Sequence, residues 1–195
     1  MDEAKLIQAA QRGDVNAFNE LVLAYQERVY NLARRIMGDP ASAADATQEA
    51  FIAAYQSIER FRGGSFKSYL MRIVSNKCYD ELRRRKRRPV KSFDDFGELD
   101  EDANPALSNG SAGPEEHAER QAVARLIQTG IETLPPHQRI TLVLSDVQGM
   151  NYQEIAAVTG VRLGTVKSRL ARARVSLRDY LREQEELLPA QYRLG

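Results

Sequence analysis

The sequence contains few of the features that mark exported or membrane-spanning proteins. Cysteine occurs once, as Cys78, so an intramolecular disulfide is excluded and no second thiolate is available for a metal site. No run of about 18 or more apolar residues occurs, which excludes an ordinary transmembrane helix. The opening residues Met1 to Lys5 include acidic side chains where a secretory signal carries a basic stretch. We therefore expect a soluble, cytoplasmic protein that makes no membrane contact of its own.

Histidine is almost as scarce as cysteine. The chain has two, His117 and His137, and neither forms a metal-binding or catalytic-triad pattern with the acidic residues. We interpret His137 as a surface or capping residue and Cys78 as a small apolar filler beside a buried face. The sequence therefore predicts no catalytic residue, metal, cofactor or small-molecule substrate. A nuclease or another enzyme acting on nucleic acid remains an alternative.

The formal net charge of +1 hides strong blocks of opposite sign. Residues 62–91 hold eleven Lys or Arg side chains and two acids, residues 92–119 hold nine acids and no Lys or Arg, and residues 162–182 hold seven basic side chains and one acid. Two basic blocks separated by an acidic one indicate two contacts with a polyanion.

Apolar residues recur at helical spacing along most of the chain, and no alternating strand pattern appears. We therefore predict an all-α fold. Ser42 is the expected N-cap of the second helix, and Asn151 with Glu154 forms an expected capping box. The predicted helices cover residues 17–37, residues 42–62 before Gly63-Gly64, residues 65–87 before Pro89, and residues 122–134, with further helices from Pro136 onward.

The interval from Pro89 to about Pro114 is rich in Asp, Glu, Gly, Ser, Asn and Pro. It cannot bury enough apolar surface to offset its ordering entropy, so we interpret it as a flexible acidic linker between two small helical domains. The predicted boundaries are residues 1–90 for the first domain, 91–116 for the linker, 117–184 for the second domain and 185–195 for a C-terminal tail.

The segment from Tyr152 to Arg174 has the parts of a helix-turn-helix. Ala156 allows a close helix crossing and Gly160 allows a tight turn. On a helical wheel the core-facing residues are Val166, Leu170, Ala173 and Leu177. The opposite sector contains Ser168 and Arg172, which suit a helix in the DNA major groove. The alternative is a solvated basic helix in an ordinary bundle.

A second pattern lies in the predicted helix after Ser65. Rings, an amide and guanidinium groups share one face, formed by Tyr69, Arg72, Asn76, Tyr79 and Arg83, whereas Phe66, Leu70 and Ile73 occupy the other. Such a face suits an unpaired nucleic-acid strand, because bases stack on rings and phosphates need cations. The basic run of residues 83–88 extends the positive surface. The alternatives are solvated charges and tyrosines that belong to the core.

These segments together resemble the extracytoplasmic-function sigma factors of the sigma-70 family, from about Ala17 to Leu181. Residues 45–51 resemble the family segment that binds the clamp helices of RNA polymerase, residues 61–80 resemble the segment that melts and reads the minus-ten element, and residues 164–174 resemble the minus-thirty-five reader. The resemblance implies two domains, sigma region 2 and sigma region 4, and a chain that is not itself an enzyme. The implied partners are core RNA polymerase, promoter DNA and an anti-sigma factor.

The resemblance also implies site residues. For core polymerase they are Asp45, Gln48, Glu49 and Phe51. For the minus-ten element they are Arg62, Ser65, Lys67, Tyr69, Arg72, Asn76, Lys77, Tyr79, Arg83 and Arg84. For the minus-thirty-five element they are Arg162, Thr165, Lys167, Ser168, Ala171 and Arg172.

Two points stay open. A conventional helix-turn-helix regulator that acts without being a polymerase subunit explains the second half of the chain, but gives no reason for residues 45–51 or for the aromatic and basic face. In the family the linker runs through the RNA exit path of the polymerase, which the acidic interval here would suit. It could equally be a solubilising tether.

Overall fold

The computed structural model describes residues 2–87, 114–184 and 186, and the side chains of residues 114–116 are not among those described. The predicted acidic linker lies outside the described residues as far as residue 113, and so does nearly all of the predicted tail. Within the described ranges the regular elements are all helical, which confirms the all-α prediction. They are α1 (Glu3–Gln11), α2 (Val15–Met37), α3 (Pro40–Ser57), η1 (Ile58–Arg60), α4 (Phe66–Arg87), α5 (Pro114–Thr133), α6 (Pro136–Leu142), the π-helical turn η3 (Val143–Val147), α7 (Tyr152–Thr159) and α8 (Leu163–Glu183).

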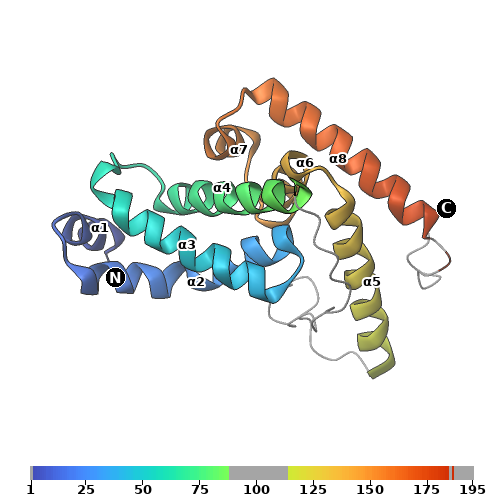
Figure 1. The fold of residues 1–195 in the computed structure, drawn as a ribbon, viewed down its shortest axis with the longest axis horizontal. Coiled ribbons are helices and arrows are strands. Elements are labelled where there is room, and N and C mark those ends of the chain that lie inside the picture. Colours follow the sequence, from blue (N-terminus) through green and yellow to red (C-terminus); the bar gives the residue numbers. More distant parts are fainter. Residues whose placement is uncertain (1, 88–113, 185, 187–195) are drawn as a thin grey trace.

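The first helical unit consists of α1 to α4. The helices α2, α3 and α4 pack against one another, and α1 lies against α2 and η1 (Figure 1). Helix α1 was not predicted, because only Ile7 and Ala10 of its short sequence are buried. Its last residue, Gln11, donates hydrogen bonds to the carbonyls of Ile58 (3.1 Å) and Phe61 (2.8 Å), which hold α1 to η1 and the residue that follows it.

The corner between α2 and α3 begins at Gly38, whose φ of 87° is the left-handed conformation that glycine adopts without a steric penalty. The expected N-cap role of Ser42 was wrong. Asp39 caps α3, because its carboxylate accepts the Ser42 backbone N–H at 2.7 Å and Pro40 takes the first helical position. Ser42 therefore lies in the first turn of the helix.

Helix α4 has the extent that the sequence predicts. Its inward face is buried from Phe66 to Leu82, including Leu70 and Val74. Cys78 is completely buried on this face, and burial raises the pKa of its thiol to about 12. This environment agrees with the interpretation of Cys78 as an apolar filler.

The second helical unit consists of α5 to α8. Its predicted capping box is present, since Asn151 accepts from the backbone N–H of Gln153 and Glu154 while the Glu154 carboxylate accepts the Asn151 N–H at 2.8 Å. Gly160 ends α7 in the left-handed conformation, as the turn requires. A Cβ at Gly130 would lie 2.6 Å from Leu177 Cδ1 and 2.7 Å from Tyr180 Cδ1, so a side chain at this position would force these two residues of α8 to shift.

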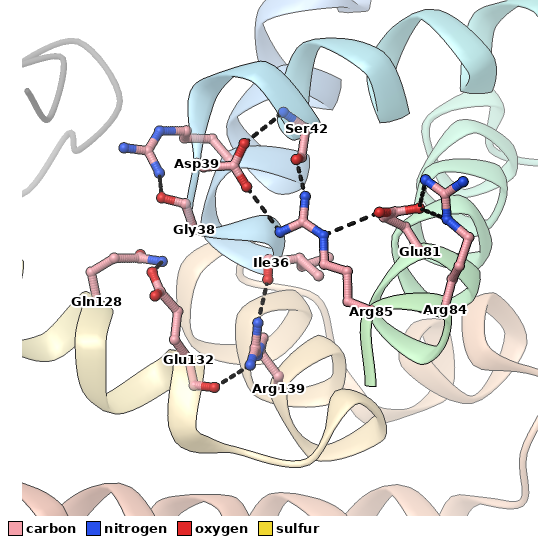
Figure 2. A network of polar contacts seen from close by, with 11 residues as sticks. Ile36, Gly38, Asp39, Ser42, Glu81, Arg84, Arg85, Gln128, Glu132 and Arg139 are labelled. Atoms are coloured by element: carbon pink, nitrogen blue, oxygen red, sulfur yellow. Dashed lines mark hydrogen bonds and ion pairs between the residues drawn. The ribbon is translucent and has the colours of Figure 1, made fainter. Parts of the chain in front are cut away.

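The two units pack directly against each other. Figure 1 shows α4 through the middle of the molecule, with α2 and α3 on one side and α6 and α7 on the other. Arg139 of α6 is only 7% exposed and donates to the Ile36 carbonyl of α2 at 2.8 Å and to the Glu132 carbonyl of α5 (Figure 2). Gln128 and Arg35 exchange a pair of hydrogen bonds at 3.3 Å. The contact is thus held by buried polar groups as well as by a shared apolar core.

Candidate nucleic-acid and polymerase interfaces

The first half of α8 presents a polar face to solvent. Val166, Leu170 and Ala173 are buried and Leu177 is half-buried, which confirms the wheel prediction of the inward face. Thr165 is half-buried, and its carbonyl accepts from the Ser168 hydroxyl at 3.0 Å. The exposed residues predicted for the minus-thirty-five site are Arg162, Lys167, Ser168, Ala171 and Arg172. This face therefore offers cations and small side chains on a rigid helix, as major-groove reading requires.

The predicted minus-ten residues divide by exposure. Arg62, Ser65, Arg72, Asn76, Tyr79, Arg83 and Arg84 are exposed, and Lys67, Tyr69 and Lys77 are half-buried. Tyr69 makes protein contacts, since its hydroxyl lies 2.7 Å from the Ser57 hydroxyl and donates to the Ala54 carbonyl at 3.1 Å. Its ring also packs against Phe61 and Phe66. Tyr69 thus contributes to the interior at the start of α4.

Several basic side chains of α4 already have acidic partners. Lys77 pairs with Glu49 at 3.2 Å, and Arg84 pairs with Glu81 at 2.7 Å. These pairs are at least partly solvent-exposed, and such pairs contribute only about 0–1 kcal/mol, so they can exchange for contacts with phosphate. Arg83 has no acidic partner within the described residues.

Arg85 has a structural role that the sequence did not reveal. It lies 3.0 Å from the Asp39 carboxylate and 3.1 Å from Glu81, and it also bonds the Ser42 hydroxyl (Figure 2). Burial raises the pKa of Asp39, but the hydrogen bonds from Ser42 and Arg85 outweigh it and hold the pKa below its usual range. Glu81 is a local partner four residues earlier on α4, but Asp39 and Ser42 lie at the start of α3, so nothing in the basic run itself identifies this contact.

A cleft of about 230 Å³ separates α4 from the helix-turn-helix. Asn76 and Tyr79 line it from α4, opposite His137 and Arg169. Partial burial, followed by the charges of Arg169 and Arg172, lowers the pKa of His137. One end of the predicted minus-ten face thus lies toward the second helical unit. The remaining lining residues are Ser75, Ile140, Thr159 and Val161.

The predicted polymerase-binding residues lie on α3. Asp45, Gln48 and Glu49 are exposed and line a groove of about 420 Å³ between α3 and α4. Phe51 is half-buried and packs against the core instead. Ile52, which the sequence reasoning missed, is 50% exposed. Its position three residues after Glu49 puts an apolar side chain beside the acidic ones, and that spacing could have identified it.

The described residues contain no cluster of three or more His, Cys, Asp or Glu side chains that could hold a metal ion. No helix among them is both long and apolar enough to cross a bilayer.

Comparison with known proteins agrees with this geometry. The family model of sigma-70 region 2 matches residues 21–88, and that of sigma-70 region 4 matches residues 124–177. The chain is 38% identical over 165 residues to the ECF RNA polymerase sigma factor SigE of Mycolicibacterium smegmatis, and 35% identical over 175 residues to the ECF RNA polymerase sigma-E factor of Escherichia coli K12. The chain belongs to the extracytoplasmic-function sigma factors. It is therefore an initiation subunit that directs RNA polymerase to promoters.

The coverage of these relatives differs. The alignments cover 85% and 88% of this sigma factor, but 62% of the Mycolicibacterium protein and 90% of the Escherichia protein. The chain thus spans less than two thirds of the first relative and nearly all of the second.

Solved structures share the fold. The structure of CnrH in complex with the cytosolic domain of CnrY has a TM-score of 0.64 and 26% identity, and covers 90% of this sigma factor and 94% of that chain. The sigma factor RpoE of Bartonella quintana, crystallised with the anti-sigma factor NepR, has a TM-score of 0.63 and 24% identity over 86% and 98% of the two chains.

Proposed function

We propose that this sigma factor binds core RNA polymerase through the outward face of α3. Asp45, Gln48 and Glu49 are exposed there beside Ile52, so the face combines charge with an apolar anchor. Phe51 supports this face from within by packing on the core. The proposed division of labour is residues 1–90 for polymerase and minus-ten binding and residues 117–184 for minus-thirty-five binding.

For the minus-ten element we propose that Arg72, Asn76, Tyr79 and Arg83 contact the unpaired strand. Arg62, Ser65, Lys67, Lys77 and Arg84 contribute polar and basic groups near it, and Tyr69 holds the start of α4 in place. Stacking on a ring contributes about 1–3 kcal/mol per base, so Tyr79 matters most after the duplex opens. Because Asn76 and Tyr79 line the cleft against the helix-turn-helix, region 4 has to move away before bases enter.

For the minus-thirty-five element we propose that Arg172 reads a base, with Lys167 and Ser168 beside it. The small side chain of Ala171 leaves room for the edge of the DNA groove. Arg162 and Thr165, at the start of α8, contact the DNA backbone. A bidentate base contact contributes about 1–3 kcal/mol of discrimination.

The observation that carries the proposal is that each matched region contains one helix with an exposed basic face, α4 in the match to sigma-70 region 2 and α8 in the match to sigma-70 region 4. A conventional regulator would use only the second face. The test is transcription in vitro with core polymerase and a promoter library. Defined start sites are expected, and duplex binding without any effect of polymerase would favour the regulator.

Variants divide the proposal into parts. Substituting both Asp45 and Glu49 by Lys should weaken binding to core polymerase while helicity is retained. Glu27→Lys, at an exposed position of α2, is the matched control.

Arg172→Ala should relax the base preference at one or two positions of the minus-thirty-five element. An equal loss of affinity for every sequence would make Arg172 a phosphate contact.

Asn76→Ala and Tyr79→Ala should impair transcription from a duplex promoter, and a template already melted across the minus-ten element should restore it.

We also propose an anti-sigma protein as a further partner, acting in the cytoplasm where polymerase works. The support is that CnrH, a related chain of the same fold, was solved with the cytosolic domain of CnrY. We expect this sigma factor to act by binding alone, with the chemistry of RNA synthesis done by the polymerase. An equimolar anti-sigma domain should abolish core binding, and unaltered core binding would argue against it.

A further inference from the structure

One arginine of the basic helix α8 is committed to protein partners. Arg174 meets the Asp146 carboxylate as a fork, with Nε 3.0 Å from Oδ2 and Nη2 2.6 Å from Oδ1. The same Nη2 lies 3.4 Å from the Ser145 hydroxyl. Two parallel charge-assisted hydrogen bonds fix the direction of a contact as well as strengthening it.

The acid–base properties of the pair agree with this geometry. Burial raises the pKa of Asp146, but the hydrogen bonds from Arg174 and Ser145 outweigh it and hold the pKa below its usual range. The hydrogen bonds to Asp146 raise the pKa of Arg174. Both partners are therefore charged near neutral pH.

The contact joins two elements of the second helical unit. Asp146 belongs to the π-helical turn η3, and Arg174 lies in the second half of α8. The apolar stripe of α8 determines which face points inward. Apolar packing is non-directional, however, so it constrains the tilt of the helix less than a fork of hydrogen bonds does.

We propose that Arg174 is a positioning residue for promoter recognition. By pairing with Asp146 it sets the tilt of α8, and so the distance at which Arg172 meets a base edge in the minus-thirty-five duplex. This inference rests on the proposed function of α8. The two side chains are 49% and 38% exposed, but two nitrogens of Arg174 bind two different oxygens of Asp146, unlike the pairs of Lys77 and Arg84. In this proposal Arg174 is held on Asp146, so its role is to orient α8 and not to contact a base or a phosphate.

The test uses polymerase holoenzyme carrying the full chain, on a promoter selected in the transcription experiment. Affinity is compared between the intact minus-thirty-five element and a scrambled one, over a range of salt. The discrimination is the ratio of these two affinities. Arg174→Gln should reduce this ratio about tenfold and leave the salt dependence of binding unaltered. Loss of a phosphate contact would instead make the plot of log binding constant against log salt concentration less steep by about 0.9.

A second variant separates positioning from a general loss of charge. Asp146→Asn removes a negative charge near DNA, which by itself would strengthen binding, yet it should lose discrimination as Arg174→Gln does. The double variant should lose no more than either single one, because both break the same pair. Arg178→Gln is the matched control, since Arg178 pairs with the adjacent Asp179 on the same helix. All affinities are measured at a temperature where circular dichroism shows each variant folded.

The outcomes are distinct. Three results would each overturn the positioning role. They are additive losses of discrimination in the double variant, a weaker salt dependence of binding for Arg174→Gln, and discrimination that does not change in either single variant. A wild-type holoenzyme that does not discriminate the two elements would overturn the proposed function of α8 itself. Discrimination that falls in Arg172→Ala but not in the Arg174 and Asp146 variants would overturn this inference alone.

Discussion

In the first helical unit α4 is held by apolar packing along its whole inward face, with the rings of Tyr25, Phe61 and Tyr69 around Phe66 at its start. In the second unit α8 buries a shorter stripe of apolar side chains, and polar contacts add to the packing of α8, α7 and α6. These contacts are the capping box of α7, the Arg174 fork and the buried guanidinium of Arg139.

The two helices proposed to bind DNA are therefore sensitive to different kinds of substitution. Apolar burial responds little to pH or salt, so α4 is disturbed mainly by changes of volume. Hydrogen bonds and ion pairs depend on geometry and protonation, so region 4 is disturbed by single polar substitutions.

Phe66→Ala should have the largest effect on stability. Phe66 is 1% exposed, and its removal leaves a cavity that costs about 3–5 kcal/mol of unfolding free energy. Urea denaturation measures the change. Leu23→Ala, at a site that is 67% exposed, is the control and should stay within about 0.5 kcal/mol. A loss below about 1 kcal/mol for Phe66→Ala would contradict the apolar account of α4.

Arg139→Met should lower the free energy of unfolding by about 1.5–3 kcal/mol, because it leaves the buried carbonyls of Ile36 and Glu132 without their charged donor. Faster amide hydrogen exchange is expected where α2 meets α5 and α6. Arg125→Ala, an exposed arginine of α5, is the control. If Arg139→Met exchanges no faster than the control, this hydrogen bonding does not hold the two units together.

Asn151→Ala should cost about 1 kcal/mol, since it removes the acceptor of the α7 capping box. The thermal midpoint measures the loss. Gln153→Ala keeps the backbone N–H that Asn151 accepts and should change the midpoint much less. Equal effects of the two substitutions would show that the cap contributes nothing beyond general helix propensity.

The smallest expected effect is a pH dependence from His137. Its pKa is lowered in the folded state, so the unfolded chain binds the proton more readily. The corresponding stability is fully present above about pH 6.5 and is lost as pH falls through the lowered folded-state pKa. The urea midpoint of the wild type should fall more between pH 7.5 and 5.5 than that of His137→Gln. Parallel profiles would contradict this assignment.

Much of the fold was open to prediction from local patterns. The extent of α4, the capping box at Asn151, the turn at Gly160 and the inward face of α8 each depend on residues within a few positions of one another. Periodicity and capping act over that range, so the amino-acid order alone identifies them. Ser42 was misassigned because the helix begins earlier than its apolar pattern indicates: Asp39 accepts the Ser42 backbone N–H, and Pro40 takes the first helical position.

The choice among chemically similar side chains was decided only by the tertiary structure. Arg83 and Arg85 are equivalent in the basic run, yet Arg85 reaches Asp39, 46 residues away in the chain, and becomes part of the α2–α3 corner. Arg139 and Ile36 are 103 residues apart, and their contact brings the two helical units together. The order of residues determined the helices, their caps and the location of positive charge, because those properties are local. Which arginines remain available to DNA depends on acceptors brought close by packing, and that became known only from the folded chain.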